Sequence, residues 1–125
     1  MNSKCRLTTL FAMSTVMIAA CSVEPEISFK SDIKPITDNY CLECHKAGGE
    51  GVTASGFLTD SYESIMQGTK YGPVIVPGDA LSSSLYRLVS GKVHSSIRMP
   101  HGKDALKQEE IVKFELWIDQ GAKNN

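Results

Sequence analysis

The segment Cys41-Leu42-Glu43-Cys44-His45 forms the pattern C-x-x-C-H, which constrains the chain more than any other feature. This spacing is typical of c-type haem attachment. Two thiols separated by two residues can add to the two vinyl groups on one edge of a porphyrin. The adjacent histidine can then bind the iron through a ring nitrogen. The motif therefore predicts one covalent haem c with its iron, bound by Cys41 and Cys44, with His45 as the proximal ligand.

A zinc site and a redox-active dithiol are the two other common uses of a C-x-x-C pair. A zinc site needs a second pair of ligands, but no other close pair of cysteines occurs. His94 and His101 stand seven residues apart with no cysteine near them. A redox dithiol usually lies between a strand and a helix of a βαβ unit. The sequence shows no pattern typical of such a unit. Haem attachment is therefore the expected role of the motif.

Residues 1–20 have the layout of a secretory signal peptide rather than of a folded domain. Lys4 and Arg6 give a short positive region. The mostly apolar residues 7–20 are too few for a spanning helix, which needs about 20 apolar residues. The run ends in Ile18-Ala19-Ala20-Cys21, which resembles the lipobox of bacterial lipoproteins. We expect a lipid anchor on Cys21; the alternative is ordinary cleavage nearby, with Cys21 as a free thiol.

The remaining cysteines fit this interpretation. Cys5 would leave with the signal and Cys21 would carry the lipid, so that no thiol remains for a disulfide once the haem is attached. The predicted organisation is a signal peptide at 1–20, a lipidated cysteine and short tether at 21–28, and a domain at 29–125. The seven residues 22–28 reach at most about 25 Å, so the domain should lie close to the membrane.

About 105 residues follow the signal, which is enough for one domain. Eleven Lys and Arg residues stand against fourteen Asp and Glu residues after position 20. No basic run indicates nucleic-acid binding. We therefore expect no nucleic-acid partner.

Apolar periodicity predicts helices and no strand of any length, so the fold class is all-α. Phe29, Ile33, Ile36 and Tyr40 mark one face of a helix that leads into the motif. Pro35 is compatible with that helix if the regular part starts near residue 31 or 32, or if the helix kinks. Residues 46–58 are predicted to form a Gly-rich loop, in which a carbonyl could accept the free ring N–H of the histidine.

Three further helices are expected. The first starts near Asp60, its predicted cap, and stops at Gly68; the second covers about 82–90. The last runs from about 107 to 120 and stops at Gly121. Its apolar stripe comprises Ile111, Phe114 and Ile118, with Leu116 and Trp117 beside it. Residues 71–79 and 91–105 are predicted to be loops.

An electron-transfer haem needs a second axial ligand opposite the proximal histidine. Three of the five methionines fall in the predicted signal: Met1, Met13 and Met17. Met66 lies in a short predicted helix, where methionine usually belongs to the core. Met99 precedes Pro100 in a long loop, and thioether ligation favours the ferrous iron. Met99 is therefore the predicted ligand, with His101 and then His94 as the alternatives.

With these residues in place, residues 29–122 resemble a class I monohaem cytochrome c. The closer resemblance is to cytochrome c-like modules common in Bacteroidetes and Planctomycetes. The segments that carry it, besides the motif, are Val76-Pro77-Gly78-Asp79, Ser84-Leu85, Arg98-Met99-Pro100 and residues 117–122. Two positions depart from the pattern: His101 replaces a frequent proline or glycine, and Lys107 replaces a Ser or Thr cap, for which Asp104 would substitute.

The resemblance implies a class I cytochrome c fold, with about four helices around one covalently bound haem. The terminal helices would cross, and the haem would lie in a crevice with one edge exposed. Candidate ring contacts are Leu58, Val74, Val76, Leu85, Leu88, Ile97 and Trp117, although plain core packing explains them equally well. Arg87 and Arg98 could pair with the haem propionates or remain solvated.

The resemblance also implies a function. We expect an electron carrier and not an enzyme, in which a haem ligated by His45 and Met99 passes single electrons between redox partner proteins at the membrane. The alternatives are a haem-based sensor or enzyme with an open sixth position, and a haem subunit of a larger oxidoreductase. The protein would accordingly be a monomer or a subunit of a larger complex.

The expected location is the cell envelope, facing the periplasm and held by the lipid anchor. Each buried methylene of an acyl chain contributes about 0.8 kcal/mol, so two or three chains would make release negligible. Ser22, which follows the lipidated position, favours the outer over the inner membrane. Export agrees with the haem, because the family's thioether linkage is made outside the cytoplasm in bacteria.

Overall fold

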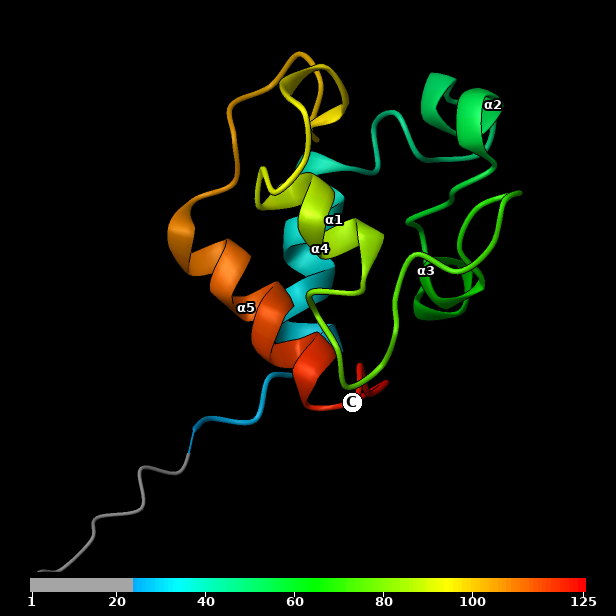
Figure 1. The fold of residues 1–125 in the computed structure, drawn as a ribbon. Helices are drawn as coiled ribbons and strands as arrows, with labels where there is room; N and C mark the ends of the chain where they lie inside the picture. The colour runs from blue at the N-terminus through cyan, green and yellow to red at the C-terminus, as the bar shows by residue number, and fades with distance from the viewer. Residues whose placement is uncertain (1–23) are drawn as a thin grey trace, which may run out of the picture.

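The computed structural model describes residues 24–125 as short helices joined by long loops (Figure 1). The elements in chain order are the π-helical turn η1 (Phe29–Ile33), α1 (Lys34–Tyr40), α2 (Glu50–Ser55), α3 (Tyr62–Gln67), α4 (Ser84–Val89), the 3-10 turn η2 (Ser95–Ile97) and α5 (Gln108–Asp119). Residues 24–125 contain no strand, only an isolated bridge between Thr69 and Gly72. The all-α prediction is confirmed, with five α-helices rather than about four.

The predicted signal peptide at 1–20 and the predicted lipid anchor at Cys21 lie outside the described residues. Within residues 24–125, no helix combines the length and the apolar character needed to cross a bilayer.

Pro35 accounts for the unusual opening of the first helix. The N–H groups of Asp32 and Ile33 both donate to the carbonyl oxygen of Ser28, at 2.9 and 3.3 Å, which widens the first turn to π geometry. Proline has no N–H, and its ring clashes with the carbonyl four residues earlier in a regular helix. The regular helix therefore begins only at Lys34, where the missing N–H of Pro35 costs little.

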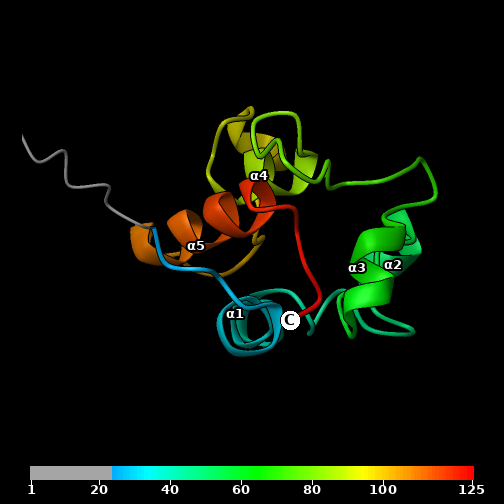
Figure 2. The same cartoon turned by 90° about the horizontal axis from the view of Figure 1, so that it is seen from below.

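The core lies where η1 packs on α5 and α5 packs on α4 (Figures 1 and 2). Phe29 and Ile33 of the first helix are buried, as is the α5 stripe of Ile111, Phe114, Trp117 and Ile118. The ring centroids of Phe29 and Trp117 lie 5.6 Å apart. Burying each large apolar side chain contributes about 1.5–3 kcal/mol, so this packing of the chain's two ends holds the domain together.

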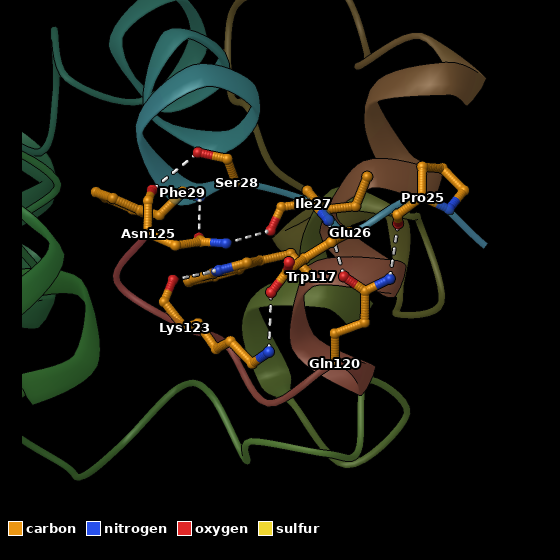
Figure 3. A network of polar contacts seen from close by, with 9 residues as sticks. All are labelled: Pro25, Glu26, Ile27, Ser28, Phe29, Trp117, Gln120, Lys123 and Asn125. Atoms are coloured by element: carbon orange, nitrogen blue, oxygen red, sulfur yellow. Dashed lines mark hydrogen bonds and ion pairs between the residues drawn. The ribbon is translucent and has the colours of Figure 1, made fainter. Parts of the chain in front are cut away.

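Two segments that are distant in sequence form what we call the terminal clamp, which joins residues 25–29 to residues 117–125 (Figure 3). The side-chain amide of Gln120 accepts from the N–H of Ile27 at 2.8 Å and donates to the carbonyl of Pro25 at 2.9 Å. The side chain of Asn125 accepts from the N–H of Phe29 at 2.8 Å. The described part of the expected tether is therefore bonded to the domain, and the side chain of Ile27 is buried.

Three local predictions are wrong. The expected loop at 46–58 contains helix α2, because a six-residue helix is too short to show an apolar period. Ser61 rather than Asp60 caps α3, since its Oγ accepts from the N–H of Ser64 at 3.1 Å. At α5 the carboxylate of Glu110, not that of Asp104, accepts the N–H of Lys107 at 2.8 Å.

Candidate functional site

The motif forms a tight turn that continues from the end of α1. The N–H of Cys41 donates to the carbonyl of Thr37 at 2.9 Å, and the N–H of His45 donates to the carbonyl of Cys41 at 2.9 Å. The two cysteines are not joined by a disulfide. Cys41 is partly buried, which raises the pKa of its thiol to about 11, whereas Cys44 is exposed. The turn places both sulfurs and the imidazole along one cavity.

The His45 ring is held by a backbone carbonyl from the predicted segment 46–58. Its Nδ1 lies 2.9 Å from the carbonyl oxygen of Phe57. A carbonyl oxygen can only accept a hydrogen bond, so Nδ1 must carry the ring proton. The lone pair of Nε2 is then free to bind a metal. Histidines that bind metals usually have their second ring nitrogen fixed in this way. The expectation that such a carbonyl accepts the ring N–H is confirmed.

Gly51, at the start of α2, lies against the face of the same ring. A Cβ at this position would come within 2.6 Å of Cε1 and 2.7 Å of Nδ1 of His45. Neighbouring Gly49 is equally confined, since its Cβ would lie 2.3 Å from the carbonyl oxygen of Cys44. Because Gly49 and Gly51 have no side chain, α2 can approach the motif closely. The same glycines led the sequence analysis to predict a loop here.

The motif borders a largely apolar cavity of about 380 Å³. Its lining comes from the motif, α2, the segment after it, α4 and the loop that follows: Tyr40, Cys41, Cys44, His45, Glu50, Gly51, Ala54, Ser55, Phe57, Thr69, Val74, Leu85, Leu88, Val89, Met99, Pro100, His101 and Lys103. Cavities of this size and character are typical of cofactor sites.

Met99 lies in the wall of this cavity, as does His45. The N–H of Met99 donates to the carbonyl of Leu88 at 3.2 Å, which ties the loop to the end of α4, and its side chain packs against the core. His101 also lines the cavity, although it is exposed. His94 does not; its Nδ1 lies 2.9 Å from Oγ of Ser96 on the exposed turn η2.

Lys103 joins the Met99 loop to the haem motif. Its Nζ lies 2.7 Å from a carboxylate oxygen of Glu43 and donates to the carbonyl of Asn39 at 3.2 Å. The lysine lowers the pKa of the Glu43 carboxyl, and the carboxylate raises the pKa of Lys103. This contact, which the sequence pattern did not indicate, closes the loop over the end of α1.

The residues predicted to contact the haem ring lie in different parts of the structure. Three of the seven candidates line the cavity: Val74, Leu85 and Leu88. The other four are not part of the lining; Val76 and Ile97 are exposed, and Trp117 is buried in the core, where its indole N–H donates to the carbonyl of Lys123. Phe57, Ala54 and Val89 also line the cavity, and no sequence pattern indicated them.

The two arginines proposed for propionates differ. Arg98 lines a polar groove that shares Met99, Pro100, His101 and Lys103 with the cavity wall. Arg87 is exposed on α4 and belongs to neither hollow. The structure thus brings Arg98, but not Arg87, next to the cavity.

A comparison with protein families matches residues 41–102 to the family described as Planctomycete cytochrome C. The match begins at Cys41 and includes the cavity-lining segments up to the Met99 loop. This segment is a Planctomycete cytochrome C domain. No curated protein and no solved structure matches the chain significantly.

The family membership confirms the resemblance expected from the sequence over these residues. Cytochrome c domains carry electrons on a covalently attached haem, and members of the family are typically carriers rather than enzymes. The residues of this domain suit that group: two thiols at the attachment spacing, an imidazole with a free Nε2 and a largely apolar cavity meet at one place.

Proposed function

We propose that the protein is an exported, membrane-tethered c-type cytochrome that carries single electrons. In this proposal Cys41 and Cys44 form the thioether bonds, and His45 and Met99 are the axial ligands. The observation that carries the proposal is the meeting of these four residues, from two distant stretches of the chain, in the wall of one cavity.

The bound haem would supply the one-electron chemistry, and the chain would set its conditions. His45 presents Nε2 in a fixed orientation because Phe57 accepts its other ring proton. Apolar side chains exclude water from the cavity, and a thioether from Met99 would favour the reduced state. A filled sixth position would leave the protein no substrate to transform, which agrees with a carrier.

Met99 is favoured over His101 by its setting. Its side chain is half-buried against the core, whereas His101 is exposed at the cavity mouth. Holding an exposed imidazole over an iron would require ordering the loop at the expense of its entropy. The half-buried Met99 side chain needs less further ordering.

Changing Met99 to Ala tests the ligand directly. The ferric wild type should show the weak near-infrared-edge absorption band of methionine ligation, and Met99→Ala should lose it. The reduced variant should bind carbon monoxide, while the reduced wild type should not. His101→Ala is the matched control from the same loop and should keep both wild-type properties.

Two results would contradict the ligand set. If the band is absent from the wild type and His101→Ala changes the spectrum, the sixth ligand is the histidine. If the reduced wild type binds carbon monoxide readily, the sixth position is open and the sensor or enzyme is the better function. A polypeptide mass without haem, under conditions in which haem maturation works, would reject covalent attachment itself.

Lipidation of Cys21 would place the carrier at the periplasmic face of the envelope, with redox proteins of the membrane as its partners. The lipobox-like Ile18-Ala19-Ala20-Cys21 supports this part of the proposal. Mass spectrometry of the N-terminal peptide and fractionation of the wild type against Cys21→Ala test it. The variant should leave the membrane fraction, and an unmodified Cys21 in the wild type would reject the anchor.

A further inference from the structure

The terminal clamp and the Cys41–His45 motif lie at opposite ends of the η1–α1 column (Figure 1). The clamp gathers residues 25–29 and 117–125 at the lower end of the view in Figure 1, and η1 and α1 run from there to the motif. These two elements contain five and seven residues. At about 1.5 Å per residue they separate the clamp from Cys41 by roughly 15–18 Å.

The clamp uses most of the chain between Cys21 and the first helix. Four backbone groups of residues 25–29 are bonded to the side chains of Gln120 and Asn125: the carbonyl of Pro25, the N–H and carbonyl of Ile27, and the N–H of Phe29. Oγ of Ser28 donates to the backbone oxygen of Asn125 at 2.8 Å. Glu26 forms an ion pair with Lys123 at 2.9 Å.

The number of residues between Cys21 and the clamp is therefore smaller than the seven residues 22–28. Only residues 22–24 stand between Cys21 and the clamp. From Cys21 to Pro25 the extended chain reaches about 14 Å. The clamp end therefore stays within about 14 Å of Cys21, whereas the motif lies roughly 15–18 Å further along the η1–α1 column.

Charge at the clamp end gives no reason for a separate electrostatic attraction to lipid. The exposed residues of this region include Lys30 and the acid Glu24, and Lys123 is paired with Glu26. A surface of mixed sign does not concentrate at anionic headgroups as a polybasic segment does. The geometry of the link would then decide which face meets the membrane.

We propose that the terminal clamp is the membrane-facing surface of the lipid-anchored domain, and that it holds the haem cavity toward the aqueous side. This inference rests on the proposed lipidation of Cys21. Redox partner proteins at the membrane would then reach the cavity from the aqueous side without competing with the bilayer, and the partner of the clamp surface is the lipid headgroup layer.

The distance of two exposed positions from the bilayer tests the orientation. Lys30→Cys places a nitroxide label at the clamp end and Ala47→Cys places one next to the motif. The lipidated holoprotein is reconstituted in phosphatidylcholine vesicles with or without a nickel-chelating lipid. The nickel-dependent relaxation should be several-fold larger at position 30 than at position 47, and added salt should not change this ratio.

Two variants lengthen the link in different ways. A Gly-Ser insertion after Val23 leaves the clamp intact, and the pair Gln120→Ala with Asn125→Ala weakens it. Both should bring the ratio toward one while the absorption spectrum of the haem stays unchanged. Equal relaxation at the two positions in the wild type, or stronger relaxation at position 47, would overturn the inference.

Coupling the mature protein through Cys21 to a maleimide lipid, with the nitroxide carried at position 30 or 47 by a residue that has no thiol, separates this inference from the proposed anchor. If the cell leaves Cys21 unmodified, the proposed anchor fails, but the chemically anchored protein still reports the orientation. A several-fold ratio in that sample supports the clamp geometry, and a ratio near one rejects it.

Discussion

Gly51 is the residue on which the orientation of the His45 ring depends most directly. An alanine there would gain about 0.8–1 kcal/mol of helix propensity, but its Cβ would lie 2.6 Å from Cε1 of the ring. Overpacking of this kind costs about 1–3 kcal/mol, so the steric cost prevails. Gly51→Ala should lower the denaturation midpoint of the haem-bound protein and change the g-values of its ferric electron paramagnetic resonance spectrum.

Thr53→Ala is the control for this prediction, because Thr53 is exposed on the same helix. It should leave the g-values as they are. Unchanged g-values in Gly51→Ala would show that the ring does not depend on the close approach of α2.

Individual residues of the site differed in how far the sequence could predict them. The three residues of the motif are close in the chain, so their chemistry follows from spacing alone. Met99 was predicted as the candidate axial ligand by elimination, because only two methionines remain after the predicted signal. Gly51 could not be predicted, since its contact with the ring depends on a helix that glycine-rich composition concealed.

At the scale of elements, the ion pair between Lys103 and Glu43 links the Met99 loop to the motif. Lys103→Met should loosen the loop, so that the near-infrared-edge band disappears at a lower guanidinium concentration than in the wild type. Glu43→Gln should act similarly, and the double variant should add little. Lys107→Met, an exposed lysine beyond the loop, is the control. Additive single effects would contradict the coupling.

The pKa shifts of this pair define its pH range. The pKa of Glu43 is lowered, so its contribution is complete above the ordinary carboxyl pKa of about 4.3 and is lost as the pH falls through the folded value. The pKa of Lys103 is raised, so its contribution is complete below about 10.4 and is lost as the pH rises through the folded value. The difference between the wild type and Lys103→Met should therefore vanish at both extremes in a pH series of the denaturation midpoint.

The sequence predicted elements better where they were long. The 12-residue α5 has a full apolar stripe, and its expected bounds differ from the observed ones by one residue at each end. The caps were less predictable, because several polar residues near each helix start compete for the same N–H groups. Ser61 and Glu110, rather than Asp60 and Asp104, accept these N–H groups. Their backbone positions decide this, and no sequence pattern shows those positions.

At the scale of the whole molecule, the segment before η1 contributes to the core through Ile27. Ile27 is 7% exposed, and its replacement by alanine should destabilise the domain by about 2–5 kcal/mol, as other large-to-small core changes do. Guanidinium denaturation of the haem-bound protein measures this. Val76→Ala, at a position 45% exposed, should stay within about 0.5 kcal/mol of the wild type. A chain starting at Phe29 should lose at least as much free energy of unfolding as Ile27→Ala. If that chain were as stable as the wild type, the segment before η1 would have no role in the core.

This part of the architecture could not be predicted from the sequence. The clamp bonds join residues 93 to 98 positions apart, and no pattern in the sequence pairs the two segments with each other. Polar contacts between chain ends depend on where the helices have already brought those ends.

Because Asn125 is bonded to residues 27–29, the two ends of the described chain lie in one region of the domain, and the fold is suited to insertion as a unit. A host protein could receive it in a surface loop through two short linkers. The cavity mouth would then point away from the host, and several such units in one polypeptide would each keep an accessible redox centre.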